Sequence, residues 1–271
     1  MPYFTVVIPS YNRGHIVDRA IESVLNQSYS DFEIIVVDDG SIDDTRTVIS
    51  SQNEPRITYF FQQNKGVCSA RNLGASEAKG DYLVFLDSDD YVAKEWLMDF
   101  YKAIIEKVPA IVRCRKDDEN IIDNNSYQGF LAGSFAIRKD VFYEVGMYDE
   151  NLHYGENTEL KWRIDSCKYT TIIINKQNLF YDATFSLGGG NKENKIRFFY
   201  YVIEKHQAYF NKNTFLSQLL YQVTGVTCFQ LGRVKEGMRL LWLGYLKNPL
   251  KLKALGRVIF YSFKLLNFKR T

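Results

Sequence analysis

The chain has 271 residues, a formal net charge of +2, 46% hydrophobic residues and 24% charged residues. These values exclude a disordered or fibrous chain, and the length is sufficient for one large domain, or for one domain with an appendage. The four cysteines lie far apart in the sequence, with no Cys-x-x-Cys pair and no nearby histidine. We therefore expect reduced thiols, and neither a disulfide framework nor a zinc site.

Charge is divided unevenly along the chain. Residues 191–271 contain 15 Lys and Arg against 3 Asp and Glu, a net +12, whereas residues 1–190 contain 19 against 29, a net −10. Two halves of opposite sign indicate two regions with different roles. We place the boundary between them at the triple glycine 188–190.

Strands and helices are predicted to alternate over the first hundred residues. Apolar β-branched runs predict strands, and apolar residues at helical spacing predict helices. In chain order we predict a strand at 4–8, a helix at 16–25, a strand at 32–37, a helix at about 43–51, a strand at 57–61, a helix at about 67–78 and a strand at about 82–86. This alternation indicates an α/β fold whose mostly parallel sheet is covered on both faces.

The later elements are less regular. We predict a helix at 94–107, a strand at 110–115, a polar loop at 116–128, a strand at 130–137, helices at 139–145 and 158–168, and strands at 170–174 and 177–183. Only helices are predicted beyond residue 190, at 192–210, 214–231, 234–247 and 249–267. The uncharged stretch 213–232 contains three Gln and three Thr, which favours a bundle or membrane-surface helix over a membrane span.

Three carboxylates, Asp87, Asp89 and Asp90, follow the predicted strand at 82–86 within four residues. Ligands of open α/β sheets bind at the carboxyl ends of the strands. A divalent cation such as Mg²⁺, held by one or two carboxylates and by substrate phosphates, suits such a cluster. The alternative is an acidic turn that caps the helix starting near Lys94.

Polar residues also follow the first two strands. The segments are Pro9-Ser10-Tyr11-Asn12 and Asp38-Asp39-Gly40-Ser41, and in a parallel sheet both face the same crevice as Asp87. A carboxylate there can accept hydrogen bonds from a ribose hydroxyl or a base N–H. Neither a Gly-x-Gly-x-x-Gly nor a Gly-Lys-Ser/Thr loop is present, which excludes a dinucleotide dehydrogenase and a P-loop enzyme.

Two cations lie near the start of the predicted helix at 67–78. Lys65 precedes the helix within Asn64-Lys65-Gly66, and Arg71 lies in its first turns. A pair of cations beside the crevice suits a diphosphate. Solvated helix charges are the alternative interpretation.

The order and spacing of these motifs resemble those of family-2 glycosyltransferases with the GT-A (Rossmann-like) fold. The matching segments are Pro9-Ser10-Tyr11-Asn12, residues 33–41, Asn64-Lys65-Gly66 with Ala70-Arg71-Asn72, and Leu86-Asp87-Ser88-Asp89. The resemblance implies a metal-dependent, inverting hexosyltransferase that moves a sugar from a nucleoside diphosphate, usually UDP, to an acceptor hydroxyl. It also implies that Asp39 contacts the base, that Asp87 contacts the ribose and the metal, and that Asp89 holds Mg²⁺ or Mn²⁺. The other donor-site residues would be Pro9, Tyr11, Asn12, Asp38, Gly40, Asn64, Lys65, Gly66, Arg71 and Ser88.

A second signature of that family covers residues 132–138, 145–152 and 155–160, with one departure. Family members read Gly-Glu-Asp where this chain reads Gly155-Glu156-Asn157, and their Asp is the general base. An amide cannot accept the acceptor's proton. We favour Glu156 as the base, ahead of Glu159 and His153; the other readings are a donor-binding pseudo-enzyme without turnover, or an engineered Asn157. A purely structural reading is that Glu156 and Asn157 cap the helix at 158–168.

Residues 249–271 alternate Lys and Arg with Leu, Ile and Phe. A basic amphipathic helix of this kind suits an anionic membrane surface and would lead the enzyme to a lipid-linked acceptor. A solvated face on a helical bundle is the alternative, and no nucleic-acid-binding motif is present. The apolar run 4–8 is too short for a signal peptide, so we expect a cytoplasmic protein, peripheral at the inner face of the membrane.

Together these patterns predict a GT-A domain at 1–190, with a donor-binding half at about 1–107 and an acceptor-side half at about 108–190. A basic helical region follows at 191–271. The expected function is transfer of a sugar from a UDP-sugar to a saccharide or lipid-linked acceptor in surface polysaccharide or glycolipid synthesis. A nucleotidyltransferase would need a Gly- and Arg-rich loop after the first strand, which Pro9-Ser10-Tyr11-Asn12 does not supply.

Overall fold

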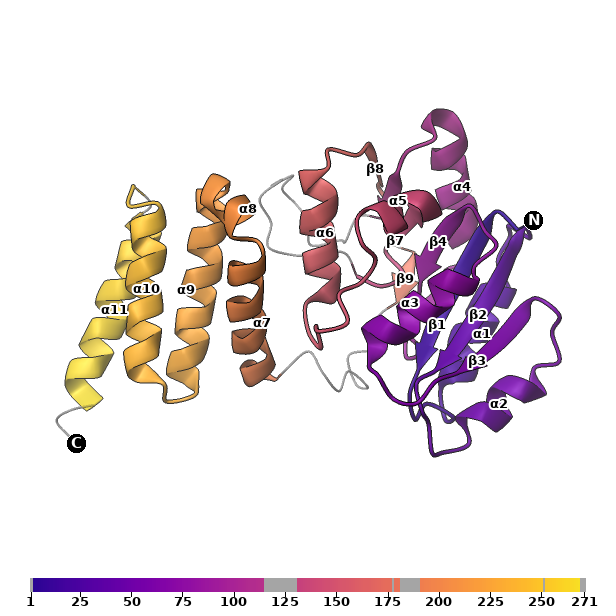
Figure 1. The fold of residues 1–271 in the computed structure, drawn as a ribbon, viewed down its shortest axis with the longest axis horizontal. Helices are drawn as coiled ribbons and strands as arrows, with labels where there is room; N and C mark the ends of the chain where they lie inside the picture. Colours follow the sequence, from indigo (N-terminus) through magenta and orange to yellow (C-terminus); the bar gives the residue numbers. More distant parts are fainter. Residues whose placement is uncertain (1, 115–130, 177, 181–190, 251, 269–271) are drawn as a thin grey trace. The chain divides into compact units, whose positions relative to one another are not determined.

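The computed structural model describes residues 2–114, 131–176, 178–180, 191–250 and 252–268 (Figure 1). The chain divides into two compact units. The sheet unit comprises the described residues up to Phe180, and the helical unit comprises those from Asn191 onward. The predicted polar loop at 116–128 and the predicted boundary at 188–190 lie outside the described residues.

A seven-stranded sheet with the order β3-β2-β1-β4-β7-β6-β8 forms the sheet unit. Its strands are β1 (Phe4–Ser10), β2 (Phe32–Asp38), β3 (Ile57–Phe61), β4 (Tyr82–Phe85), β6 (Ile111–Cys114), β7 (Phe135–Arg138) and β8 (Thr171–Ile174). All neighbours pair in parallel except β7, which is antiparallel to both β4 and β6. The prediction of a mostly parallel α/β sheet is therefore confirmed.

Helices cover both faces of this sheet because the side chains of β1 alternate between two apolar layers. Phe4, Val6 and Ile8 share a core with α1 (Val17–Leu25) and α4 (Trp96–Lys107). On the other face, Gly74 of α3 (Val67–Glu77) lies so close to Val7 and Val37 that a larger side chain would collide with them. The remaining helices are α2 (Thr45–Ser51), α5 (Lys139–Glu144) and α6 (Glu156–Ser166).

Two predicted strands are shorter than expected in the described residues. The strand predicted at 130–137 begins at Phe135, because residues 131–134 form a turn in which Gly133 has φ +78°. The strand predicted at 177–183 appears as β9 (Leu179–Phe180), and residues 177 and 181–183 lie outside the described ranges. β9 pairs with β5 (Tyr91–Val92), which was not predicted, and the Tyr91 and Phe180 rings stack with centroids 5.0 Å apart.

The helical unit consists of α7 (Lys192–Lys205), α8 (Gln207–Lys212), α9 (Thr214–Gln230), α10 (Val234–Lys247) and α11 (Leu252–Phe268) (Figure 1). The single helix predicted at 192–210 is broken at His206, which has φ −112° and ψ 32°. α9 and α10 pack closely because Gly225 and Gly237 face each other: a Cβ on Gly237 would lie 2.8 Å from the Gly225 carbonyl oxygen. Within the described residues, every helix falls short of the length and hydropathy that a membrane span requires.

Candidate active site

The loops after β1 and β2 begin side by side, because Ser10 pairs with Asp38 at the carboxyl ends of the two strands. They are tied together by hydrogen bonds. The Asn12 N–H donates to Ser41 Oγ at 2.8 Å, and Asn12 Oδ1 accepts from the Ile42 N–H at 2.9 Å. Asn12 has φ +53°, a conformation that Asn tolerates better than most residues.

Asp38 and Asp39 are both buried, and both accept hydrogen bonds from neighbouring loops or from β3. Asp38 accepts from the Ser41 N–H and from the Tyr59 hydroxyl, each at 2.8 Å. Burial, followed by the bond to Asp38, raises the pKa of Tyr59 to about 12, so this hydroxyl remains a donor at neutral pH. Asp39 accepts from the Lys65 and Gly66 N–H groups at 2.8 and 2.9 Å, and so fixes the start of α3.

Gly40 and Asn64 are in close contact where these loops meet. Gly40 has φ +86°, and a Cβ at this position would lie 2.8 Å from the Asn64 backbone nitrogen. Glycine is therefore required for the turn and for the close approach. Tyr11 is 46% exposed and Lys65 is also exposed, whereas Pro9 and Ser10 are buried in β1.

The acidic turn after β4 faces two arginines. Asp87 accepts a hydrogen bond from Arg71 at 2.6 Å, and the Asp89 carboxylate lies 3.7 Å from the Arg13 guanidinium. Burial, followed by the charge of Asp87, raises the pKa of Asp89. Ser88, which lies between Asp87 and Asp89 in the sequence, is buried. The turn does not cap α4, because the residue at its N-cap is Glu95.

Arg71 joins this turn to the start of α6. Its side chain is 2% exposed, and its guanidinium donates to Asp87 at 2.6 Å and to Glu156 Oε1 at 2.9 Å. It also lies over the Tyr148 ring, 5.1 Å from the centroid. Burial opposes the charge of Arg71, but the two carboxylates outweigh it and raise the pKa further above its usual value. The guanidinium is thus already bound to protein groups on both sides.

Glu156 and Asn157 are the first residues of α6, and Gly155, with φ +73°, occupies the N-cap. Among the described residues neither side chain makes a cap hydrogen bond, so the interpretation that they cap this helix is wrong for hydrogen bonding, although Glu156 is an acid in the first turn. Asn157 instead donates to Glu156 Oε1 at 3.2 Å and accepts from the Tyr148 hydroxyl at 2.8 Å. Burial raises the pKa of Tyr148, which keeps its hydroxyl protonated. Among the described residues, no group donates to Glu156 Oε2.

The two other candidate bases, Glu159 and His153, differ in their exposure to solvent. Glu159 is buried, and its carboxylate accepts three hydrogen bonds from Arg163 at 2.7 to 3.0 Å. His153 is exposed, with Nδ1 3.7 Å from the position of a Cβ on Gly66. His153 therefore lies beside the loop that Asp39 holds, whereas Glu159 is enclosed.

The family model for glycosyl transferase family 2 matches residues 5–182, which is more than half of the chain. The chain belongs to glycosyltransferase family 2. GlyG of Streptococcus pneumoniae, a glycosyltransferase, is 28% identical over 217 residues, which is 78% of this chain and 69% of GlyG. Of seven other curated relatives, this family-2 chain covers between 13% and 40% of the length.

Two solved structures share the fold of this glycosyltransferase. TarS residues 1–349 of S. aureus, solved with UDP-GlcNAc, matches with a TM-score of 0.65 and 17% identity, over 96% of this chain and 89% of that chain. The mannosyltransferase PcManGT of Pyrobaculum calidifontis was solved with GDP-Man and Mn²⁺. It matches with a TM-score of 0.66 and 17% identity, over 98% of this chain and 87% of that chain. The predicted family and GT-A fold are thereby confirmed.

Sequence reasoning assigned no role to two residues that hold this site together. Tyr148 and Asn72 bond to each other twice through the Asn72 side chain, at 2.9 and 3.0 Å, and Tyr148 also contacts Arg71 and Asn157. Both residues lie inside the two family signatures, so their motif positions were the available signal. Their function as links depends on contacts across 76 residues of sequence, which no local pattern reveals.

Proposed function

We propose that this glycosyltransferase moves a sugar, with inversion, from a nucleoside diphosphate sugar to an acceptor hydroxyl, and we favour a UDP-sugar as donor. The observation that carries the proposal is a continuous chain of polar contacts from the acidic turn to α6, formed by Asp87, Arg71, Glu156, Asn157 and Tyr148. It links a candidate donor site to a candidate base. The nucleotide sugars bound to TarS and PcManGT support the choice of donor.

For the donor, we assign Asp39 to the nucleobase, Asp87 to the ribose and the exposed Lys65 to the diphosphate. The loops that carry them start at one edge of the parallel sheet and are fixed by the hydrogen bonds of Asn12 and Asp39. The exposed ring of Tyr11 adds a flat apolar surface beside them. Such a preorganised site can hold a nucleotide without further ordering.

We assign the metal ion to Asp89, with Asp87 as second ligand. Among the described residues, no three His, Cys, Asp or Glu side chains gather closely enough to hold a metal alone. Two carboxylates nevertheless fit Mg²⁺ or Mn²⁺, because such ions take the rest of their oxygen ligands from substrate phosphates and water. A bound ion would stabilise negative charge on the departing diphosphate.

We propose that Arg71 is a positioning residue. Because its guanidinium is buried and bonded to Asp87 and Glu156, it sets the separation between the donor side and the base side. Precise placement of reacting groups lowers the barrier by avoiding reorientation during the reaction.

We propose Glu156 as the general base, acting through Oε2. Its other oxygen is held by Arg71 and Asn157, which orients the carboxylate. Oε2 would take the proton of the acceptor hydroxyl while the acceptor oxygen bonds to the anomeric carbon. The bond from that carbon to the diphosphate breaks in the same step, and the electron pair leaves with the diphosphate.

For the acceptor, we propose a saccharide or a lipid-linked saccharide at the inner face of the membrane, in surface polysaccharide or glycolipid synthesis. Exposed apolar residues of α11, namely Ile259, Phe260 and Phe263, support this proposal, since Lys253 and Arg257 of the same helix are exposed as well. Apolar side chains can insert at the lipid interface while cations meet anionic headgroups.

Asn157 favours a second candidate, a donor-binding protein without turnover. Both candidates require donor binding, which calorimetry with UDP can test in the presence and absence of Mn²⁺. We expect tighter binding with Mn²⁺, and we expect Asp89→Ala to remove the difference. An Asp89→Ala protein that binds UDP as well as the unmodified chain in Mn²⁺ would contradict the metal assignment. Turnover then separates the two candidates.

A further inference from the structure

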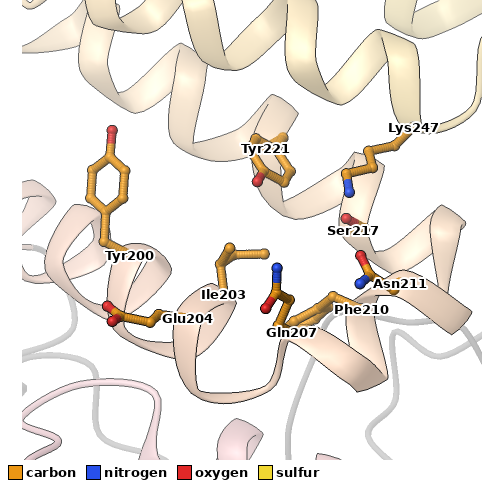
Figure 2. A pocket seen from close by; sticks show the side chains of 9 residues that line it. All are labelled: Tyr200, Ile203, Glu204, Gln207, Phe210, Asn211, Ser217, Tyr221 and Lys247. Atoms are coloured by element: carbon orange, nitrogen blue, oxygen red, sulfur yellow. The ribbon is translucent and has the colours of Figure 1, made fainter.

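The helical unit contains a pocket of about 320 Å³ formed by α7, α8, α9 and the end of α10 (Figure 2). Phe210 and Ser217 are buried in it, whereas Gln207 and Asn211 are exposed at its rim. Pockets for small molecules range from about 300 to 1,000 Å³. This pocket therefore has room for one small ring rather than for a nucleotide or a long chain.

Ser217 carries a buried hydroxyl that has no hydrogen-bond partner in the part of the chain that the structure describes. The residue is 0% exposed, and among the described residues nothing bonds to its Oγ. Hydroxyls inside helices usually bond back to a carbonyl of the preceding turn. Thr227 does so to the Val223 carbonyl at 3.0 Å, and Ser262 does so to the Val258 carbonyl at 2.8 Å. A ligand in the pocket would satisfy Ser217, and leaving a buried hydroxyl unpaired is costly.

Aromatic rings form part of the pocket wall and are held in place. The Tyr200 hydroxyl donates to Glu236 at 2.7 Å. The Tyr221 ring packs edge-on against Phe199, with centroids 4.9 Å apart. The Lys247 ammonium lies 6.0 Å from the centroid of Tyr221. These contacts give the pocket fixed apolar surfaces beside its polar groups.

The polar groups include both donors and acceptors. Figure 2 shows Lys247 extending toward Ser217 and Asn211, and the amide of Gln207 pointing toward Tyr221. Lys247 offers only donors, but Glu204 offers acceptors, and each amide and hydroxyl offers both. The opposite charges of Lys247 and Glu204 make the pocket a poor match for an anion, which needs donors alone. The many polar groups make it a poor match for a hydrocarbon.

A sugar ring matches the size, the polar groups and the aromatic rings of this pocket. It is small and neutral, its hydroxyls both donate and accept, and its C–H face packs on aromatic rings. We propose that this pocket binds one monosaccharide unit of a glycan. The proposal concerns a site outside the candidate active site. Its use as a second contact for the acceptor rests on the proposed function, whereas the binding itself does not.

Ligand-observed NMR on the full chain tests the proposal, with methyl glycosides of common hexoses and N-acetylhexosamines as probes. At least one glycoside should bind, and saturating UDP with Mn²⁺ should leave its affinity unchanged. Ser217→Ala should weaken binding about threefold to tenfold, as expected for one lost hydrogen bond. The double variant Gln207→Ala, Asn211→Ala, which changes only exposed rim residues, should weaken it by at least as much.

Ser262→Ala is the matched control, because it removes a helix hydroxyl that is outside the pocket lining and already bonded to Val258. The affinity of Ser262→Ala for the glycoside should equal that of the unmodified chain. The proposal is overturned if no glycoside binds, if the pocket variants bind as tightly as the control, or if inorganic phosphate displaces the glycoside. Donor binding, followed separately with UDP, distinguishes this failure from failure of the proposed function.

Discussion

The side-chain amide of Asn157 donates a hydrogen bond to Oε1 of Glu156 at 3.2 Å. An aspartate at position 157 could not make this bond while both side chains are ionised, because like charges at such a distance repel. The departure from the family pattern is therefore compatible with its surroundings. It leaves Glu156 oriented by one neutral donor and by Arg71.

Arg71→Met should destabilise the protein strongly. The substitution leaves the partly buried carboxylates of Asp87 and Glu156 without their cation, and breaking such a buried pair costs about 3 kcal/mol or more. Arg138→Met is the control, since its ion pair with Asp140 is exposed and should contribute about 0 to 1 kcal/mol. Urea unfolding of both variants measures the difference; equal losses would contradict the importance of the buried link.

Asp43 should contribute stability at neutral pH that is lost in acid. Burial alone would raise its pKa, but hydrogen bonds from Thr45 and Gly14 outweigh burial and lower it. A carboxyl group whose pKa is lower in the folded state stabilises the fold at pH values above its unfolded-state pKa of 3.8. This contribution disappears as the pH falls through the folded-state pKa.

Asp43→Ala should therefore cost roughly 1 kcal/mol at pH 7 and little once the carboxyl is protonated. Asp44→Ala is the matched control, because no hydrogen bond to its side chain is present among the described residues. Denaturant unfolding measures both variants at pH 7 and over a series of pH values that extends from 3.8 to below the lowered pKa of Asp43. A cost of Asp43→Ala that stays constant over this range would refute the assignment.

Replacing two helical glycines with alanine should change the stability of the protein in opposite directions. At Gly244 a Cβ would press on Tyr221 at 2.9 Å, and overpacking costs about 1–3 kcal/mol. At Gly256, in α11, a Cβ would meet no atom of the described residues within 4 Å, so alanine should stabilise the helix by up to about 1 kcal/mol. Thermal unfolding should show a lower midpoint for Gly244→Ala and a higher one for Gly256→Ala. Shifts of the same sign would show that α9 and α10 do not pack at Gly244.

The apolar surface of α11 should mediate binding to anionic membranes. Phe260 and Phe263 are 56% and 64% exposed, so replacing both with Gln should leave the fold intact. We expect the double variant to cosediment less with phosphatidylglycerol vesicles, and we expect salt to weaken binding of the unmodified chain. Phe61→Gln, an exposed aromatic in β3, should bind as the unmodified chain does. A chain that never cosediments with these vesicles excludes the membrane proposal.

The first four strands were predictable because each is an apolar run followed by polar turn residues, and only their ends shifted. β5 was not, because a strand of two residues, Tyr91 and Val92, has no periodicity to detect. The break at His206 was also missed, since the apolar spacing continues through α7 and α8. Neither feature is encoded in a local pattern.

The residues of the candidate site were predictable from the sequence, but the contacts between them were not. Arg71 was expected to face a diphosphate, yet its partners Asp87 and Glu156 lie 16 and 85 residues away and are brought to it by folding. The roles assigned to the individual donor-site residues stay predictions. The pocket around Ser217 had no sequence signal at all, because it results from how four helices pack.

The most direct test of the account is UDP release from a panel of UDP-sugars with Mn²⁺ or Mg²⁺, by the unmodified chain, Glu156→Gln and Asn157→Asp. We predict that the unmodified chain releases UDP from at least one donor, and that Glu156→Gln lowers the rate by about 100-fold or more without changing the donor affinity. Release by Asn157→Asp alone, with the unmodified chain inactive on every donor, would contradict it and assign the base to position 157.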